Sequence, residues 1–328
     1  MDLVNALFTN AIMGGSGGGG VSVEELSVTS NGYYSAPSGT AYSPVNVNVP
    51  ATTPDTATIV LARDIKSLSN YTNTEATVIG QYGFAYFNIG SKTSQGITTY
   101  GTITLPNVTI VSQNAFFSVG AEEVIMPSLS SITNYSAFVS ARIRRASYPL
   151  LTKLPSSTFA YCTSLSEVYL PNVSSVGGSA FYMCHNNPFS VTFGSLLTDM
   201  GTGAFQSCIY LSEAVFSTLK AIPQTAFSSC REMKMASFAV ASSVGNYAFY
   251  NCYNLLSLYL LSTAVTTLGG VSAFTQTPIS TRTDSTSGVH GSVFVRESLY
   301  SDYLVANNWS VYSDRIVSLT DAQIAALG

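Results

Sequence analysis

The hydrophobic pattern is dominated by a phenylalanine that returns every 21 to 25 residues along the chain. Alanine precedes it in every repeat but one, where Thr158 stands before Phe159. The eight phenylalanines of this series are Phe116, Phe138, Phe159, Phe181, Phe205, Phe227, Phe249 and Phe274. Phe84, preceded by Gly83, extends the series toward the N-terminus. Self-similarity at a period of about 20 to 30 residues indicates a solenoid in which one repeat forms one coil.

Each repeat begins with a short alternating segment. In the repeat at residues 165–184, Val168 and Leu170 alternate with Glu167 and Tyr169, which predicts a strand with one buried face. Pro171 ends this strand because proline has no backbone N–H to donate to a sheet. The alternation recurs in the other repeats, so we expect one such strand in each coil.

The second half of the repeat carries two further apolar positions and a turn. Val173 and Val176 lie eight and five residues before the phenylalanine, and apolar residues hold the same offsets in neighbouring repeats. The Gly177-Gly178 pair predicts a turn, and residues 180–184 are interpreted as a single helical turn. One repeat has too few apolar residues to close a core, so the coils must stack. The predicted fold is a repeat solenoid of short stacked parallel strands with short helical turns.

The ends of the chain differ from the repeats, which predicts four segments. Residues 1–20 form an apolar anchor segment with a glycine-rich tether, 21–55 a small β module, 56–290 the solenoid and 291–328 a strand-helix cap. The anchor residues, which share one face of a short amphipathic helix, are Val4, Leu7, Phe8, Ala11 and Ile12. The alternative for this segment is a frayed terminus without a binding role.

Composition narrows the range of partners. Charged residues make up 9% of the chain and the net charge is −4, whereas nucleic-acid binding needs a concentrated basic face. We therefore expect no nucleic-acid partner. No run of about 18 apolar residues occurs, so no membrane span is expected. Asp2 stands where a secretory signal is basic, so a signal peptide is not expected either.

The cysteines follow the repeat. Each lies three residues after a repeat phenylalanine, a slot that holds Val119, Ala141 and Thr277 in the flanking repeats. A slot that accepts these residues is small and buried, and a free cysteine packs there as a small hydrophobe. We predict reduced thiols in a packing ladder, the alternatives being disulfides or a metal site. The five residues are Cys162, Cys184, Cys208, Cys230 and Cys252.

Motifs for catalysis or phosphate binding are missing from the sequence. The two histidines, His185 and His290, fall in predicted loops, and no base is placed beside a nucleophile. The glycine run at residues 14–20 lacks the Gly-Lys-Ser ending of a phosphate-binding loop. The chain is therefore predicted to be non-enzymatic, without a cofactor or a metal.

The repeat resembles a known family. Leu170-Pro171-Asn172-Val173, together with Ala204-Phe205-Gln206-Ser207-Cys208-Ile209-Tyr210-Leu211, resembles the BspA-type (Treponema-type) leucine-rich repeat. The resemblance covers roughly residues 76–275. It implies that the strands line a concave face and that the protein acts in adhesion and in protein or glycan binding.

Both ends resemble small modules of phage and prophage structural proteins. The N-terminal resemblance rests on residues 25–34 and 41–50, and the C-terminal one on Gly291-Ser292-Val293-Phe294-Val295. Proline usually follows this strand in the C-terminal module, and Arg296 stands there instead. The resemblance implies a virion structural protein.

The outward positions of the strands are the candidate binding surface, because stacked strands form an extended face. Aromatic residues on such a face bind sugar rings or proteins, while the alternative is that they only cover neighbouring strands. The residues selected are Tyr169, Tyr259, Glu123, Arg145, Glu167 and Glu213.

Two functions are consistent with these patterns. The first is a virion component of the tail, baseplate or head-fibre type that binds a host surface glycan or protein and contacts virion proteins through its N-terminal segment. The second is a bacterial surface adhesin or protein-interaction module of the BspA type, located at the cell surface or outside the cell. Assembly into a homo-oligomer is left open in both.

Overall fold

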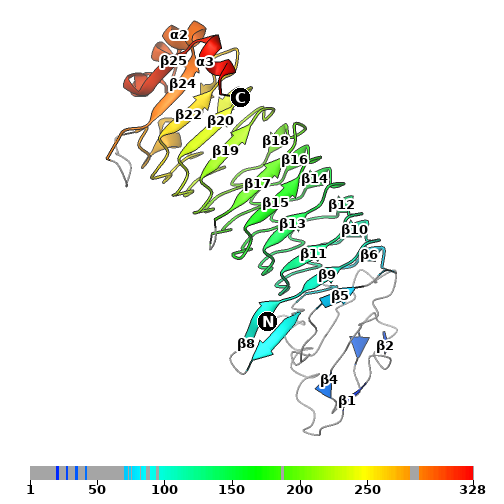
Figure 1. Cartoon of the computed structure of the whole chain (residues 1–328). Coiled ribbons are helices and arrows are strands. Elements are labelled where there is room, and N and C mark those ends of the chain that lie inside the picture. The colour runs from blue at the N-terminus through cyan, green and yellow to red at the C-terminus, as the bar shows by residue number, and fades with distance from the viewer. Residues whose placement is uncertain are drawn as a thin grey trace. The chain divides into compact units, whose positions relative to one another are not determined.

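The structure of the chain is a computed structural model (Figure 1). The structure describes residues 70–72, 74, 76–81, 83–85, 89–93, 96–185, 188–280 and 288–327, and four short strands before them. These strands are β1 (Gly20–Val21), β2 (Ser27–Val28), β3 (Tyr34–Ser35) and β4 (Ala41–Tyr42). In this region β2 pairs with β3 in antiparallel fashion, and β1 pairs with β4 in parallel. The five predicted anchor residues, Val4 to Ile12, lie outside the described residues.

The chain divides into two compact units, Met1–Leu150 and Leu151–Gly328. Both contain coils of the same kind, in which a longer strand is followed by a shorter one. The predicted segment boundaries at residues 20, 55 and 290 are not tested by this division and stay predictions.

In the first unit, the longer strands pair in parallel, and so do the shorter ones. The longer strands are β5 (Asn70–Thr72), β9 (Thr102–Thr104), β11 (Glu123–Ile125) and β13 (Arg145–Ser147). The shorter strands are β6 (Val78–Ile79), β10 (Ile110–Val111) and β12 (Ser131–Ile132). An antiparallel hairpin of β7 (Gly90–Thr93) and β8 (Gly96–Tyr100) is inserted between two coils.

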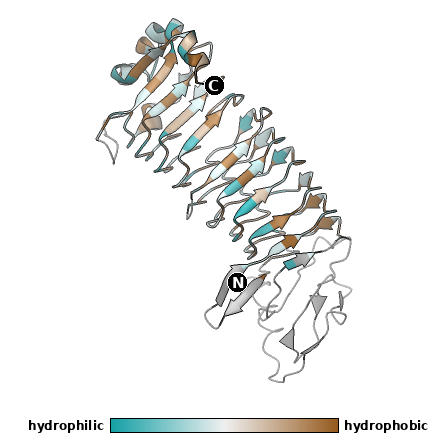
Figure 2. Cartoon of the chain, viewed as in Figure 1, coloured by the Kyte–Doolittle hydropathy of each residue, from teal (hydrophilic) through white to brown (hydrophobic). Residues whose placement is uncertain are grey.

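In the second unit, the same two kinds of strand continue. The longer strands are β15 (Glu167–Leu170), β17 (Ser190–Phe193), β19 (Glu213–Phe216), β20 (Met235–Phe238) and β22 (Ser257–Leu260). The shorter ones are β14 (Lys153–Leu154), β16 (Ser175–Val176), β18 (Asp199–Met200), β21 (Ser243–Val244) and β23 (Thr267–Leu268). Hydrophobic and hydrophilic positions alternate along several of the longer strands (Figure 2), as expected for strands with one buried face.

The last repeat phenylalanine, Phe274, ends a 3-10 helix, η2 (Val271–Phe274). In the coils of Phe116 to Phe249, the segment around the phenylalanine is a turn, which corrects the prediction of a helical turn at residues 180–184. In this segment the residues two positions before and two positions after the phenylalanine are left-handed, as at Ser179 (φ 54°) and Met183 (φ 60°). This conformation lets alternate N–H groups donate to the next coil: Phe181 donates to Ala204 (2.8 Å) and Met183 to Gln206 (3.0 Å). Because the same bonds recur from coil to coil, we call this row of turns the turn ladder. It satisfies backbone groups that a helical turn would direct along its own axis.

The repeat phenylalanines form the core. Within each unit, successive rings stack with centroids 4.8 to 5.8 Å apart and planes within 14° of parallel. Phe205, in the middle of the second unit, is 1% exposed and lies between the rings of Phe181 and Phe227. The preceding alanine, Ala204, is fully buried beneath the next coil. Stacking therefore supplies the core that no single coil contains, as predicted.

A tight corner explains why glycine recurs before the turn ladder. A Cβ atom added to Gly201 would lie 2.3 Å from the backbone nitrogen of Gly178 in the preceding coil. Gly177 and Gly245 would meet the preceding coil at 2.3 and 2.4 Å. Real Cβ atoms do not approach backbone this closely, so a side chain here would push the coils apart.

A strand-helix cap ends the second unit, as predicted. Its elements are β24 (Ser292–Arg296), η3 (Glu297–Leu299), α2 (Tyr300–Val305), η4 (Ser310–Arg315), β25 (Ile316–Leu319) and α3 (Asp321–Ala325). Strand β24 pairs with β22, and β25 pairs with β24. The cap takes the place of a further coil, because Trp309 and Tyr312 contact the ring of Phe274 at centroid distances of 5.8 and 5.4 Å.

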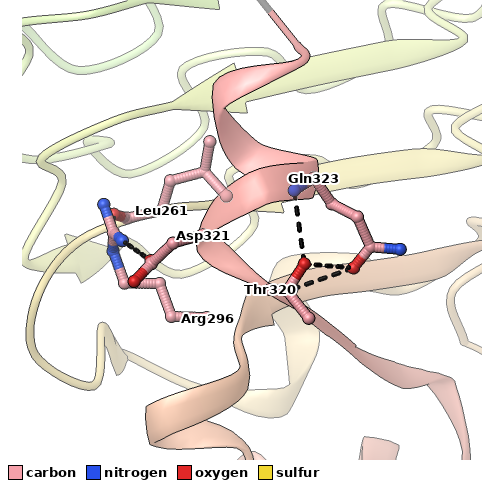
Figure 3. A network of polar contacts seen from close by, with 5 residues as sticks. All are labelled: Leu261, Arg296, Thr320, Asp321 and Gln323. Carbon is pink, nitrogen blue, oxygen red and sulfur yellow. Dashed lines mark hydrogen bonds and ion pairs between the residues drawn. The ribbon is translucent and has the colours of Figure 1, made fainter.

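Polar contacts fix the cap to the last coils. The Trp309 indole donates to the carbonyl of Thr266 (2.6 Å), and the Tyr303 hydroxyl accepts from the N–H of the same residue (2.9 Å). Arg296 donates to the carbonyl of Leu261 and forms an ion pair with Asp321 at 2.8 Å (Figure 3). Helix α3 begins at the reciprocal capping box of Thr320 and Gln323 shown in the same view.

Candidate binding surface

The candidate surface is the solvent-facing side of the longer strands, which we call the strand face. In the first unit it carries charge. Glu123 in β11 lies opposite Arg145 in β13, and their side chains form an ion pair at 3.5 Å. A second pair joins Arg144 to Glu122 at 3.7 Å. Because Arg145 is 50% exposed, its pair is screened by water and contributes little to stability.

In the second unit one column of the strand face carries valine and aromatic side chains. The register places Val215 opposite Ser237, Ser237 opposite Tyr259, and Tyr259 opposite Phe294. Strand β25 extends this column by placing Val317 opposite Phe294. Val215 is 65% exposed, and the rings of Tyr259 and Phe294 stack with centroids 4.7 Å apart. We call these five residues the apolar column.

The remaining selected residues are spread over different strands. Glu167 lies opposite Ser190, and Tyr169 lies opposite Thr192. The Glu167 and Tyr169 side chains are both exposed. Glu213 is exposed beside Met235. Tyr169 lies on β15 and Tyr259 on β22, with β17, β19 and β20 between these strands in the chain. The two tyrosines therefore belong to different parts of the strand face.

The apolar column contains two residues that the sequence reasoning missed, Phe294 and Val317. A signal for the first was present, because Val293 and Val295 alternate with it and point inward. Val317 follows a 3-10 helix rather than a repeat, so its column was not readable from the repeat spacing.

The cysteine ladder is reduced and buried, as predicted: all five thiols are free. Each of the last four donates to the carbonyl of a phenylalanine in the preceding coil, as Cys208 does to Phe181 at 3.0 Å. Burial raises the pKa of the Cys208, Cys230 and Cys252 thiols well above their usual value of 9.0. A thiol with a raised pKa stays protonated and is a poor nucleophile or metal ligand.

The described residues offer little for catalysis. The His185 ring nitrogen Nδ1 contacts the carbonyl of Met183 at 2.6 Å, a local turn contact. In the part of the chain that the structure describes, no group of three or more His, Cys, Asp or Glu side chains is arranged to hold a metal ion. A helix long and apolar enough to cross a membrane is also missing from these residues.

The BspA-type leucine-rich-repeat model matches residues 87–212 and 152–280, with 6 copies of the repeat. The chain belongs to this family. It is therefore a leucine-rich-repeat protein of the kind that acts in protein interaction or at surfaces. The family supports the bacterial adhesin or interaction protein better than the virion role, for which nothing was found.

The chain is also similar to several solved structures. A leucine-rich-repeat protein from Bacteroides ovatus is 13% identical and covers 92% of this chain and 91% of its own (TM-score 0.37). The pneumococcal vaccine antigen PcpA is 12% identical, with coverages of 90% and 95% (TM-score 0.36). For a leucine-rich cell-surface protein from Faecalibacterium prausnitzii, 15% identical, the match covers 72% of this chain and 61% of that one (TM-score 0.28). These scores are too low to bear on function. None of the curated protein sequences matches the chain significantly.

Proposed function

We propose that the chain is a bacterial surface adhesion or interaction module that binds a partner protein through the strand face of its second unit. The observation that supports this most directly is the apolar column, in which Tyr259 and Phe294 stack at its centre and Val215 remains 65% exposed. Tyr259 and Phe294 are partly exposed, and aromatic side chains are enriched at protein-binding interfaces and their hot spots. Interior packing does not require them, because the opposite side of the same strands fills the core.

A variant of the apolar column tests this function. Ser237 lies opposite Tyr259, and Thr192 lies opposite the other outward tyrosine, Tyr169. Tyr259→Ser combined with Phe294→Thr therefore introduces residue types that the strand face accepts. We expect this double variant to lose about tenfold or more in affinity for cultured epithelial cells or for partner bacteria that the wild-type protein binds. Trypsin treatment of the target cells should abolish wild-type binding. Val305→Ser is the matched control, because Val305 is 81% exposed in α2 and does not belong to the apolar column.

Location is tested separately. Lys153, Lys220 and Lys234 are exposed, so a membrane-impermeant amine-reactive biotin reagent should label the protein on intact cells that encode it. Labelling only after lysis would contradict a surface location. Presence of the protein on purified phage particles would instead favour the virion role.

A further inference from the structure

The turn ladder of the second unit carries exposed tyrosines in two pairs. Tyr161 is 46% exposed, and its ring meets that of Tyr182 edge to face at a centroid distance of 5.2 Å. Tyr247 is 40% exposed and meets Tyr250 in the same way at 5.7 Å. These side chains project from the turns rather than from the longer strands, so they belong to a different surface from the strand face.

The backbone makes these tyrosines unusual. Tyr161 stands two residues after its repeat phenylalanine with a φ of 61°, and Tyr247 stands two residues before its own with a φ of 56°. Left-handed backbone is uncommon for bulky residues, and in proteins such outliers concentrate at functional sites. The other coils mostly avoid the conflict by placing small or polar residues there. At the position two residues after the phenylalanine, these coils carry Ser118, Ser140, Ser207 and Ser229. At the position two residues before it, they carry Asn114, Ser136, Ser157, Ser179 and Gly203.

The coils between the two pairs carry hydrogen-bonding side chains. The coils of Phe205 and Phe227 present Gln206, Ser207 and Ser229 at these turns, all partly exposed and none charged. Three coil steps separate the turn of Tyr182 from that of Tyr250, which is about 15 Å at the spacing of stacked strands. The surface therefore has aromatic rings at its two ends and hydroxyl and amide groups between them, over a length that suits an extended ligand.

We propose that the two tyrosine pairs are subsites for an extended neutral glycan. A tyrosine ring offers an apolar face for the C–H side of a sugar ring and a hydroxyl for hydrogen bonding. The intervening serine and glutamine side chains match the hydroxyl groups of sugars between the two subsites. A protein hot spot would instead be a contiguous and desolvated apolar cluster. An acidic glycan would require basic side chains, and the residues at these turn positions are uncharged.

Replacement of the strained tyrosines by the residue that other coils carry gives a specific test. We expect Tyr161→Ser with Tyr247→Ser to fold normally and to melt at the same temperature or higher, because serine holds equivalent left-handed positions. Affinity electrophoresis of the full chain through gels containing mannan, xylan, laminarin or galactan measures glycan binding. At least one of these polysaccharides should retard the wild-type protein, and the double variant should bind it about tenfold or more weakly.

Controls separate this inference from the proposed function. The Tyr259→Ser/Phe294→Thr variant should be retarded like wild type, because its changes lie on the strand face. Equal retardation of the Tyr161→Ser/Tyr247→Ser variant and wild type, or no retardation by any of the four polysaccharides, would overturn the glycan assignment. Loss of trypsin-sensitive cell binding in that variant without polysaccharide binding would also overturn it, because the tyrosines would then contact a protein.

Discussion

The inward-facing residues of the strands and turns are nearly the same in every coil, whereas the outward-facing residues of the same strands and turns differ from coil to coil. Inward, phenylalanine recurs in every coil, and Phe227 and Ala226 are fully buried. Outward, the column that contains Val215 changes from aliphatic to serine to aromatic within three strands. An inward residue touches a neighbour in the coil on each side, so any change must be matched twice. An outward residue has solvent on one side, which leaves its identity free to serve binding.

Among single substitutions, loss of a central phenylalanine should have the largest effect on stability. Phe205 stacks on Phe181 at 4.9 Å and on Phe227 at 5.5 Å. We expect Phe205→Ala to lower the free energy of unfolding by about 3–5 kcal/mol, because the cavity would open in the middle of the array. Chemical denaturation followed by circular dichroism measures this change. A loss below about 1 kcal/mol would mean that inward positions are no more constrained than outward ones.

Adding a methyl group at the tight corner should lower the free energy of unfolding less than Phe205→Ala does. In Gly201→Ala the new Cβ would lie 2.3 Å from the backbone of Gly178, which cannot move without shifting its coil. We expect a loss of about 1–3 kcal/mol. Gly178→Ala is the matched control, since its nearest atom in the next coil would lie at 3.2 Å. Similar melting temperatures for the two variants would contradict the corner as a constraint on stacking.

The buried thiols predict a pH dependence. Because the pKa of Cys208, Cys230 and Cys252 is raised in the folded chain, the unfolded chain ionises first as the pH rises. Stability is therefore fully present below the usual pKa of 9.0 and falls above it, by about 1.4 kcal/mol per pH unit for each thiol. Urea denaturation at pH 8 to 10.5 measures the slope. Valine occupies the same slot at position 119, so replacing the three cysteines by valine should flatten the slope of stability against pH. An unchanged slope would mean that tyrosines, and not the thiols, cause the pH dependence.

The smallest effect is expected on the strand face of the first unit. Arg145→Ala removes an ion pair with Glu123 at 3.5 Å, but the arginine is half exposed. We expect a change in the free energy of unfolding below about 1 kcal/mol, and a smaller difference still in high salt. A double-mutant cycle with Glu123→Ala measures the coupling. Coupling comparable to the loss in Phe205→Ala would remove the distinction between inward and outward positions.

Much of the inward architecture was readable from the sequence. The period of the phenylalanines predicted the stacked coils, and the slot shared by cysteine, valine and alanine predicted buried, reduced thiols. The alternation in residues 165–171 placed Glu167 and Tyr169 on the exposed side. These predictions succeeded because each inward position repeats the same steric problem in every coil, so that the solutions accumulate along one chain.

Other features were decided only by the tertiary structure. A helical turn and the observed left-handed turn both accommodate Ala180 and Phe181, and the choice depends on N–H groups that find acceptors in the next coil. Tyr161 pairs with Tyr182 of the next repeat, and Tyr259 pairs with Phe294 of the cap. The repeat spacing alone does not give these contacts. Inward residues recur from coil to coil, so the sequence by itself determined how the coils stack. Outward residues do not recur, and only the register between coils decided which of their side chains meet on the surface.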